Sequence, residues 1–430
     1  MCVRKATNGD SARRIGFTAA AFLPLLAILP VGCGFYFVSP TDDGSPTPTL
    51  SATNDDNPTI HHENDANDLL ESAEPAAASE QAQVISGRIS GGADVDVYDL
   101  GPVEPGDRIV VDMTADDSLS GALALFDETG ATLLINDHRN VYLGRSGPFI
   151  DVVIRRPSSS CFVALASTPG YDSLGDYDLT TSIEFPTPIP QPRGDVFLLD
   201  FDAARGVRIG SRPAINVPDF DAAQISSVYE GLTEELVARV VALIREDFAA
   251  YDLTILSTSE GAEYENSMSR LHFGTFDAAL LGVAEGVDEY NALDSQEAIV
   301  FTDTFAAFMV LDPSVSEMAQ ALANVASHEI GHLLGLIHTN NPDDLMDVTA
   351  SLNELLDDQA FAKSPIYSAV FPLGEQDSIQ SLLDAVGGDA AAARQKYEDR
   401  AASTSRFQRR SWSPPARTGC SLSSCGLHHR

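Results

Sequence analysis

The chain has 430 residues, of which 44% are hydrophobic, and its formal net charge is −37. This length and apolar content suffice for two domains of ordinary size with tails. The strong negative charge argues against nucleic acid or an anionic membrane surface as a partner. The five cysteines are too few and too scattered for a disulfide framework, so a metal ion is the expected source of local rigidity.

Residues 1–33 have the composition of a signal peptide. Four basic residues precede an apolar run over 17–31 that is too short to span a bilayer comfortably. Export to the cell envelope or the medium is therefore expected. The pair Gly32-Cys33 resembles the cleavage point of a bacterial lipoprotein, in which the cysteine is acylated. Lipid anchoring through Cys33 and free secretion both stay open.

Residues 34–82 are rich in Pro, Ser, Thr, Asp and Ala, which predicts a disordered acidic spacer. From 83 to 184, short alternating segments separated by Gly, Pro and Asp predict an all-β sandwich of about eight strands. The phrases "SGRISGGADVDVYDLGPVEPGDRIVVDM" and "ALFDETGATLLINDH" resemble the pre-peptidase C-terminal domain of secreted bacterial peptidases, an accessory domain.

Four aspartates of this region offer oxygen atoms that calcium could bind: Asp94, Asp96, Asp127 and Asp137. Turn formation explains the same aspartates equally well, so calcium stays an open alternative.

Residues 185–194 contain four prolines and predict a stiff linker. The region 195–388 then reads as a second, α+β domain. Its apolar patterns predict strands over 196–201, 252–256, 271–273 and 298–302 and a helix over 233–250. Residues 389–430 carry an excess of basic residues with little periodicity, and we expect a basic disordered tail there.

The most informative segment is His328-Glu329-Ile330-Gly331-His332-Leu333-Leu334-Gly335-Leu336-Ile337-His338, which has the form HExxHxxGxxH. On a helix, His328 and His332 point from one face and can share a metal ion. Gly335 can end the helix in a left-handed conformation and bring His338 back as a third ligand. Three nitrogen ligands leave a fourth position for water, as in catalytic zinc sites.

The helix is expected to begin at Ser314, since Glu317 completes a capping box. Beyond the motif, Met346 follows His338 by eight residues. With this spacing the chain resembles the metzincin clan of zinc endopeptidases, which carry a methionine turn under the metal, and most closely its matrix-metalloproteinase branch. Thr339 and Val348 depart from the better-known branches, so the branch stays open.

The resemblance implies a twisted mixed sheet, an active-site helix, and an edge strand within residues 280–291 against which a peptide substrate would pair. It implies a zinc metalloendopeptidase in which His328, His332 and His338 hold zinc, Glu329 is the general base, and Met346 supports the ligands. The expected partner is a protein or peptide substrate. The alternative is a non-proteolytic, metal-stabilised surface binding or adhesion protein. Substrate preference, latency and oligomeric state are not encoded in the motif.

Overall fold

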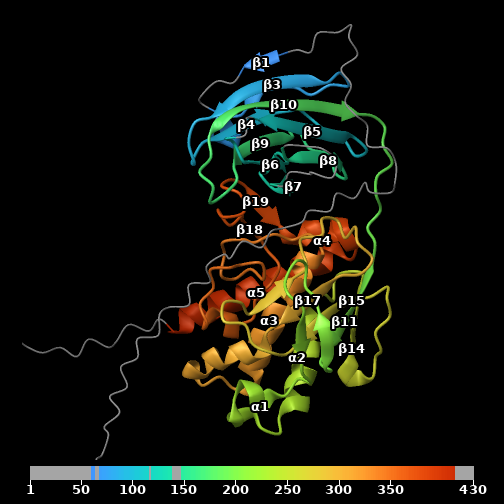
Figure 1. Cartoon of the computed structure of the whole chain (residues 1–430), viewed down its shortest axis with the longest axis vertical. Helices are drawn as coiled ribbons and strands as arrows, with labels where there is room; N and C mark the ends of the chain where they lie inside the picture. The colour runs from blue at the N-terminus through green and yellow to red at the C-terminus, as the bar shows by residue number, and fades with distance from the viewer. Residues whose placement is uncertain (1–59, 63–66, 116–117, 138–146, 412–430) are drawn as a thin grey trace, which may run out of the picture.

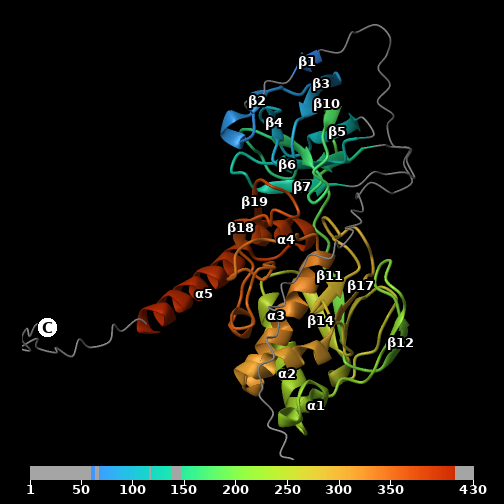
Figure 2. The same cartoon turned by 60° about the vertical axis from the view of Figure 1, so that its left-hand side comes forward.

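The computed structural model describes residues 60–62, 67–115, 118–137 and 147–411. The expected signal peptide with Cys33, most of the expected spacer and the end of the tail lie outside this range. In both views the described chain forms two stacked halves, a β-rich upper half and a lower half of mixed sheet and helices (Figures 1 and 2).

The upper half contains two facing five-stranded sheets. The first sheet contains, in spatial order, β1 (Ile60–His62), β3 (Gln83–Ile89), β10 (Gly175–Glu184), β5 (Arg108–Ala115) and β8 (Phe149–Val153). The second contains β2 (Glu74–Pro75), β4 (Val95–Asp99), β9 (Phe162–Ser167), β6 (Gly121–Phe126) and β7 (Thr132–Asn136). Apart from the parallel pairs β1–β3 and β2–β4, neighbouring strands are antiparallel.

The second sheet is covered on both faces. All six residues of β6 are buried. Leu123 and Leu125 point into the core between the two sheets, whereas Ala122, Ala124 and Phe126 point into a separate core shared with the lower half. Successive side chains of a strand point to opposite faces, so burial of every residue means that both faces are packed.

The lower half is built on a mixed five-stranded sheet. Its parallel strands are β14 (Leu253–Ser257), β11 (Asp195–Asp200), β15 (Ser269–Phe273) and β17 (Glu297–Val300). The short strand β16 (Gly282–Ala284) runs antiparallel to β17 at one edge. The predicted combination of a β-rich region with a mixed sheet and helices is therefore confirmed at this level.

The principal helices of the lower half are α2 (Thr233–Asp247) and α3 (Val315–Leu333), which pack on each other and share the main apolar core with the sheet. Shorter helical elements are α1 (Ala222–Ile225), η3 (Ser227–Tyr229), η4 (Thr258–Glu260), η5 (Thr302–Leu311), η6 (Glu354–Leu356) and α4 (Ser378–Val386), with η1 (Leu70–Ser72) in the upper half. Two small hairpins pair β12 (Ala204–Val207) with β13 (Ile215–Val217) and β18 (Lys363–Pro365) with β19 (Glu375–Asp377).

The expected disordered tail is wrong for residues 390–411, which form helix α5 (Ala390–Ser411). Asp389 caps its start, since its carboxylate accepts hydrogen bonds from the N–H groups of Ala391 and Ala392 at 3.0 and 3.1 Å. A run of four alanines, which have the highest helix propensity, follows this cap. Basic side chains farther along α5 then pair with a buried carboxylate of α2, a long-range contact that composition alone does not reveal.

The expected spacer is also shorter than 34–82, because β1, η1 and β2 lie within that range. The main chain of residues 76–78 extends the second sheet. The N–H of Ala76 donates to Asp99 O at 2.9 Å, and that of Ala78 donates to Leu100 O at 3.0 Å. Hydrogen bonding along a sheet edge orders this segment despite its low content of large apolar residues.

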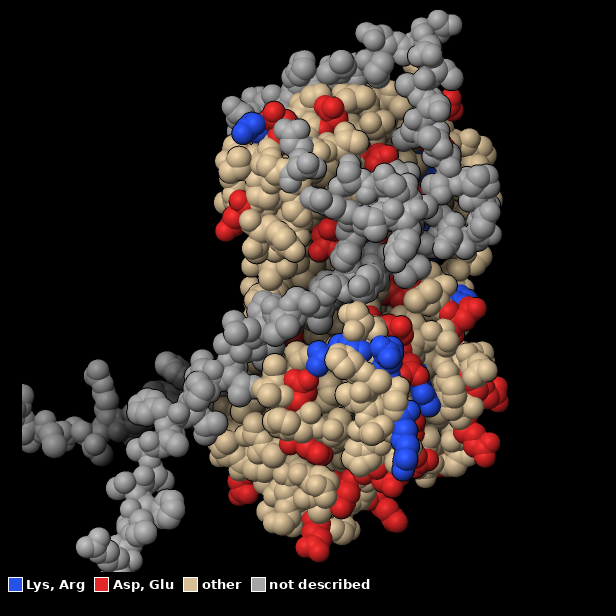
Figure 3. Space-filling view, viewed as in Figure 1, with Lys and Arg blue, Asp and Glu red and all other residues tan. Residues whose placement is uncertain are grey.

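The two halves are joined by more than the predicted linker. β18, β19 and α4 lie directly beneath β7 in both views (Figures 1 and 2). The linker is hydrogen-bonded to both halves near its two ends. Thr187 N–H donates to Gly106 O of the upper half and Arg193 N–H donates to Ala385 O of the lower half, each at 2.9 Å. Asp and Glu are spread over the visible face of both halves, whereas most of the visible Lys and Arg lie on the lower half (Figure 3). Among the described residues, no helix has the length and apolar character required to cross a membrane.

Candidate metal centre

Helix α3 carries the first two histidines of the motif in its last two turns. Its start has the expected capping box, in which Glu317 N–H donates to Ser314 Oγ at 3.3 Å and Ser314 N–H donates to Glu317 Oε2 at 2.8 Å. After the helix ends, Gly335 adopts a φ of 95°. A Cβ at Gly335 would lie 2.9 Å from the Cα of Glu289, so both backbone angle and space require glycine.

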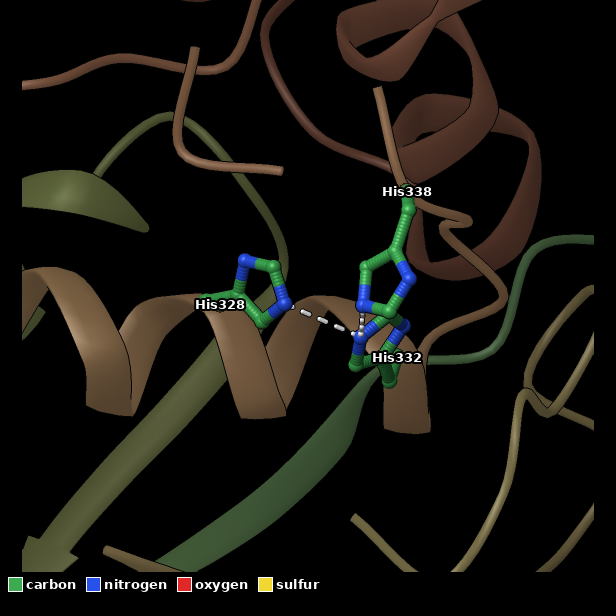
Figure 4. Close-up of side chains that lie close together, drawn as sticks. All are labelled: His328, His332 and His338. Atoms are coloured by element: carbon green, nitrogen blue, oxygen red, sulfur yellow. Dashed lines mark hydrogen bonds between the residues drawn. The ribbon is translucent and has the colours of Figure 1, made fainter. Parts of the chain in front are cut away.

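The three motif histidines meet at one point (Figure 4). His332 Nε2 lies 3.0 Å from His328 Nε2 and 3.0 Å from His338 Nε2. Within the described residues, these histidines are the only group of three or more His, Cys, Asp or Glu side chains placed to hold a metal ion.

The tautomers follow from the other ring nitrogens. His328 Nδ1 lies 2.7 Å from Leu345 O, and His332 Nδ1 lies 2.8 Å from Leu336 O. A carbonyl oxygen only accepts, so these Nδ1 atoms carry the proton and the Nε2 atoms are unprotonated. Unprotonated nitrogens facing one another at 3.0 Å repel unless a cation lies among them. The donor set therefore fits a zinc ion, which is commonly bound by neutral imidazole nitrogens.

Burial keeps these rings neutral. It lowers the pKa of His328 to about 4 and that of His332 to about 3, and it lowers the pKa of His338 well below its usual value. Neutral rings are the form that binds a metal, so the three ligand positions are available at neutral pH without loss of protons.

Glu329 is buried beside His328, between α3 and the edge strand β16. Burial raises the pKa of Glu329 to about 8, and the N–H of Ala284 in β16 opposes the rise. Gly282 makes room for the carboxyl group, since a Cβ there would lie 2.9 Å from both Cγ and Cδ of Glu329. The glutamate thus faces the strand at which a bound peptide is expected.

Met346 is fully buried under the helix. Its sulfur would lie 2.6 Å from a Cβ at Gly331, which means that only a glycine leaves space for it between the two helical histidines. Thr339 N–H donates to Met346 O at 2.9 Å, closing the loop between His338 and Met346. Met346 therefore packs against the ligand-bearing backbone.

Asp344 holds this loop and was not singled out from the sequence. Its carboxylate accepts from Thr339 Oγ1 at 3.0 Å and from Met346 N–H at 3.1 Å. Burial raises the pKa of Asp344 to about 6. Thr339, which departs from the better-known branches, thereby has a structural partner. The composition of residues 340–344, Asn-Asn-Pro-Asp-Asp, is typical of a loop, but it does not indicate which aspartate turns inward.

The aspartates considered for calcium have other partners. Asp94 accepts from Ser90 Oγ at 2.6 Å, Asp127 accepts from Thr129 and Ala131 N–H groups within its turn, and buried Asp96 accepts from Tyr177 OH at 2.7 Å. Among the residues that the structure describes, Asp137 belongs to no group placed to hold a metal. The turn-forming explanation accounts for Asp94 and Asp127.

Residues 262–361 match the matrixin family of peptidases. The resemblance to zinc metallopeptidases of the metzincin clan is therefore confirmed for the segment that contains the whole motif. The match supports a metallopeptidase without defining its substrate. No curated protein is similar to the chain in sequence.

Several solved structures are similar to parts of the chain, with low sequence identity and low TM-scores. Archaemetzincin from Methanopyrus kandleri is 16% identical over 40% of this chain and 89% of that chain, with a TM-score of 0.23. Metalloproteinase-II from Bacteroides fragilis is 11% identical over 72% and 92%, with a TM-score of 0.24. The pre-peptidase C-terminal domain of a collagenase from Bacillus anthracis is 16% identical over 26% and 94%, with a TM-score of 0.20.

Proposed function

We propose that the chain is an exported zinc-dependent endopeptidase. The observation that carries the proposal is the convergence of the Nε2 atoms of His328, His332 and His338, with the carboxyl group of Glu329 beside them. A binding protein stabilised by a metal would need the three ligands but would not need a buried carboxyl group next to them. The presence of Glu329 therefore favours catalysis over the alternative of a surface adhesion protein.

His328, His332 and His338 would hold zinc. When bound there, zinc supplies an activated water and polarises a carbonyl group. The positive charge favours the ionised form of Glu329, opposing the effect of burial on its pKa. Glu329 would accept a proton at its carboxylate during attack on the peptide and deliver it to the leaving amine.

Strand β16 would hold the substrate. It lies at the edge of the mixed sheet, with β17 on one side. An extended peptide can add to such an edge through main-chain hydrogen bonds, which places its backbone along the strand next to Glu329. This mode of binding suits a site that cuts within a chain, because an added strand continues in both directions.

Export is supported by the basic and apolar composition of residues 1–33. Sequencing the mature N-terminus from membrane and medium fractions separates an acylated Cys33 from a freely secreted form. The expected substrate is a protein or peptide outside the cytoplasm.

The test of the catalytic proposal is Glu329→Gln in the full chain. Hydrolysis of an unfolded protein should fall by roughly 10²–10⁴-fold, because the base is lost while the ligands remain. Zinc content, measured by metal analysis, should be unchanged. The matched control is Glu263→Gln, at an exposed glutamate in the same domain, which should retain activity. Undiminished hydrolysis by Glu329→Gln would refute the assignment.

A further inference from the structure

The turn that carries His338 is held on one side by a single buried amide. Ile337 N–H donates to Gln376 Oε1 at 2.7 Å, and Gln376 Nε2 donates to Ile337 O at 2.9 Å. Gln376 thus satisfies both main-chain groups of the residue directly before His338. It is buried in β19, far from the motif in sequence.

β19 is in turn fixed to the β-sandwich. Glu375, next to Gln376, donates its N–H to Gly130 O at 2.9 Å, and it forms a parallel bridge with Ala131. Gly374, the residue before, lies so close to the ring of Phe126 that an added Cβ would collide with it. The sandwich therefore contacts the strand that holds Ile337, through the β6–β7 connection and the end of β6.

A second segment holds the other side of the turn and is also bonded to the sandwich. Asp288 N–H donates to His332 O at 3.0 Å, and the main chain of Glu289 packs against Gly335. Across the boundary, Tyr290 OH donates to Leu133 O at 2.7 Å, and Ile135 N–H lies 3.4 Å from Glu289 Oε1. Leu133 and Ile135 both belong to β7.

Ile337 itself lies in the apolar core between the halves. This core joins one face of the second sheet to the loops that surround the metal centre. Its buried members are Val95, Val97, Ala122, Ala124, Phe126, Ile135, Ala164 and Ala166 from the sandwich and Val287, Ile337, Ile366, Val370 and Phe371 from the lower half. The residue before the third histidine is thus packed against the sandwich as well as hydrogen-bonded through Gln376.

We propose that the β-sandwich is a positioning part of the metal centre, which holds His338 at the third ligand position through Gln376 and Ile337. The inference rests on the proposed function only in taking His338 as a ligand. His338 comes after the helix has ended, so its place depends on the turn rather than on α3. Groups that orient metal ligands typically change metal affinity by about 10–100-fold when they are removed.

The test compares adjacent residues of one strand in the full chain. Phe126→Ala removes packing on the boundary, whereas Leu125→Ala removes packing inside the sandwich alone. Gln376→Ala removes the amide that holds Ile337. Zinc affinity, measured by competition with a chelator, should fall about tenfold or more for Phe126→Ala and Gln376→Ala and should stay within about twofold for Leu125→Ala.

A second measurement needs no metal and no activity. Hydrogen exchange at the Ile337 amide in metal-free protein should quicken in Phe126→Ala and Gln376→Ala and should be unchanged in Leu125→Ala. If Phe126→Ala fails to fold, Phe126→Leu is the milder variant with the same expected direction. Gln376→Glu keeps the acceptor for Ile337 N–H and loses the donor, so its zinc affinity should lie between those of wild type and Gln376→Ala.

Wild-type zinc affinity in both boundary variants would overturn the proposal, as would an equal loss in Leu125→Ala, which would indicate general destabilisation. If the wild type binds zinc but cuts no peptide, the proposed function fails and the affinity series still decides this inference. If the wild type binds no zinc, His338 is not a ligand and the inference fails together with the proposed function. Protection of the Ile337 amide that does not depend on Phe126 and Gln376 refutes the inference by itself, whatever the zinc content.

Discussion

Helix α3 contacts buried polar groups on two sides. The charge on one side is paired by residues of the chain, whereas the nitrogen atoms on the other side face one another without a cation from the described part of the chain. On one side, three neutral histidines point their Nε2 atoms at one another. On the other, the carboxylate of Asp247 accepts from Ser327 Oγ at 2.7 Å and lies 3.1 Å from Arg400 and 3.6 Å from Lys396. Ser327 directly precedes His328, so the two sites are joined through adjacent residues of one helix.

The difference shows which site the chain completes by itself. Burial raises the pKa of Asp247, while Arg400 and Lys396 oppose the rise with positive charge from α5. A buried charge is tolerated when it is paired and hydrogen-bonded in this way. The histidine site differs because its groups are uncharged donors of electron pairs. A cation that binds there must be a metal ion from solution, since the described residues place no cationic side chain among them. The chain's own residues thus balance one site, and the other is built for a ligand.

The largest stability effect should come from unbalancing the Asp247 site. Arg400→Met leaves Lys396, at 3.6 Å, as the remaining cation beside the buried carboxylate of Asp247. The free energy of unfolding should fall by about 3 kcal/mol, because a buried charge that loses its partner retains its desolvation cost. Denaturant unfolding of metal-free protein measures it.

The matched control is Arg394→Met on the same helix. Arg394 is exposed and lies 3.9 Å from Asp377, and such pairs contribute at most about 1 kcal/mol. Equal effects of the two substitutions would show that the Asp247 site is not a buried pair in solution, and the contrast between the two sides of α3 would be lost.

The next largest effect on stability should come from zinc binding at the histidine site. Zinc at a hundred times its dissociation constant should stabilise the protein by about 2.7 kcal/mol, because it binds the folded chain. Thermal unfolding with zinc and with chelator measures the difference. His332→Ala removes the central ligand and should abolish the response. A response that persists in His332→Ala would place the stabilising ion elsewhere.

Local signals in the sequence predicted that the three histidines come together. Helical spacing brings His328 and His332 together, Ser314 and Glu317 form the capping box, and the left-handed angle at Gly335 returns the chain. Each of these depends on residues a few positions apart, and short-range geometry is what a sequence pattern encodes.

The supports of the site were missed because they come from distant parts of the chain. The sequence predicted disorder where helix α5 forms. The prediction was wrong because the partner of the basic side chains of α5 is Asp247, a buried residue about 150 positions earlier in the chain. The docking of the sandwich did leave a signal in β6. Its run Gly-Ala-Leu-Ala-Leu-Phe lacks the polar positions of a strand with one exposed face, which is typical of a strand covered on both sides.

The smallest expected effect on stability concerns His272, a third buried polar group. Like the metal-centre groups it is a histidine, but like Asp247 it is paired with charged side chains of the chain. Its ring nitrogens are 3.4 Å from Asp200 and 3.6 Å from Glu297. Burial acts to lower the pKa of His272, but the two carboxylates outweigh it and raise the pKa above the ordinary 6.5. Here the chain supplies anions for a histidine that takes up a proton, instead of leaving its nitrogens to a metal.

A raised folded-state pKa means that the stabilisation from His272 is fully present below pH 6.5 and is lost as the pH rises through the folded value. The gap in unfolding free energy between wild type and His272→Gln should therefore narrow as the pH is raised from 6.5. Denaturant unfolding with chelator present measures this gap. The three ligand histidines, whose pKa values are lowered, change stability on the acid side of 6.5, so they do not interfere. A gap that stays constant above pH 6.5 would show that His272 is neutral, like the histidines of the metal centre.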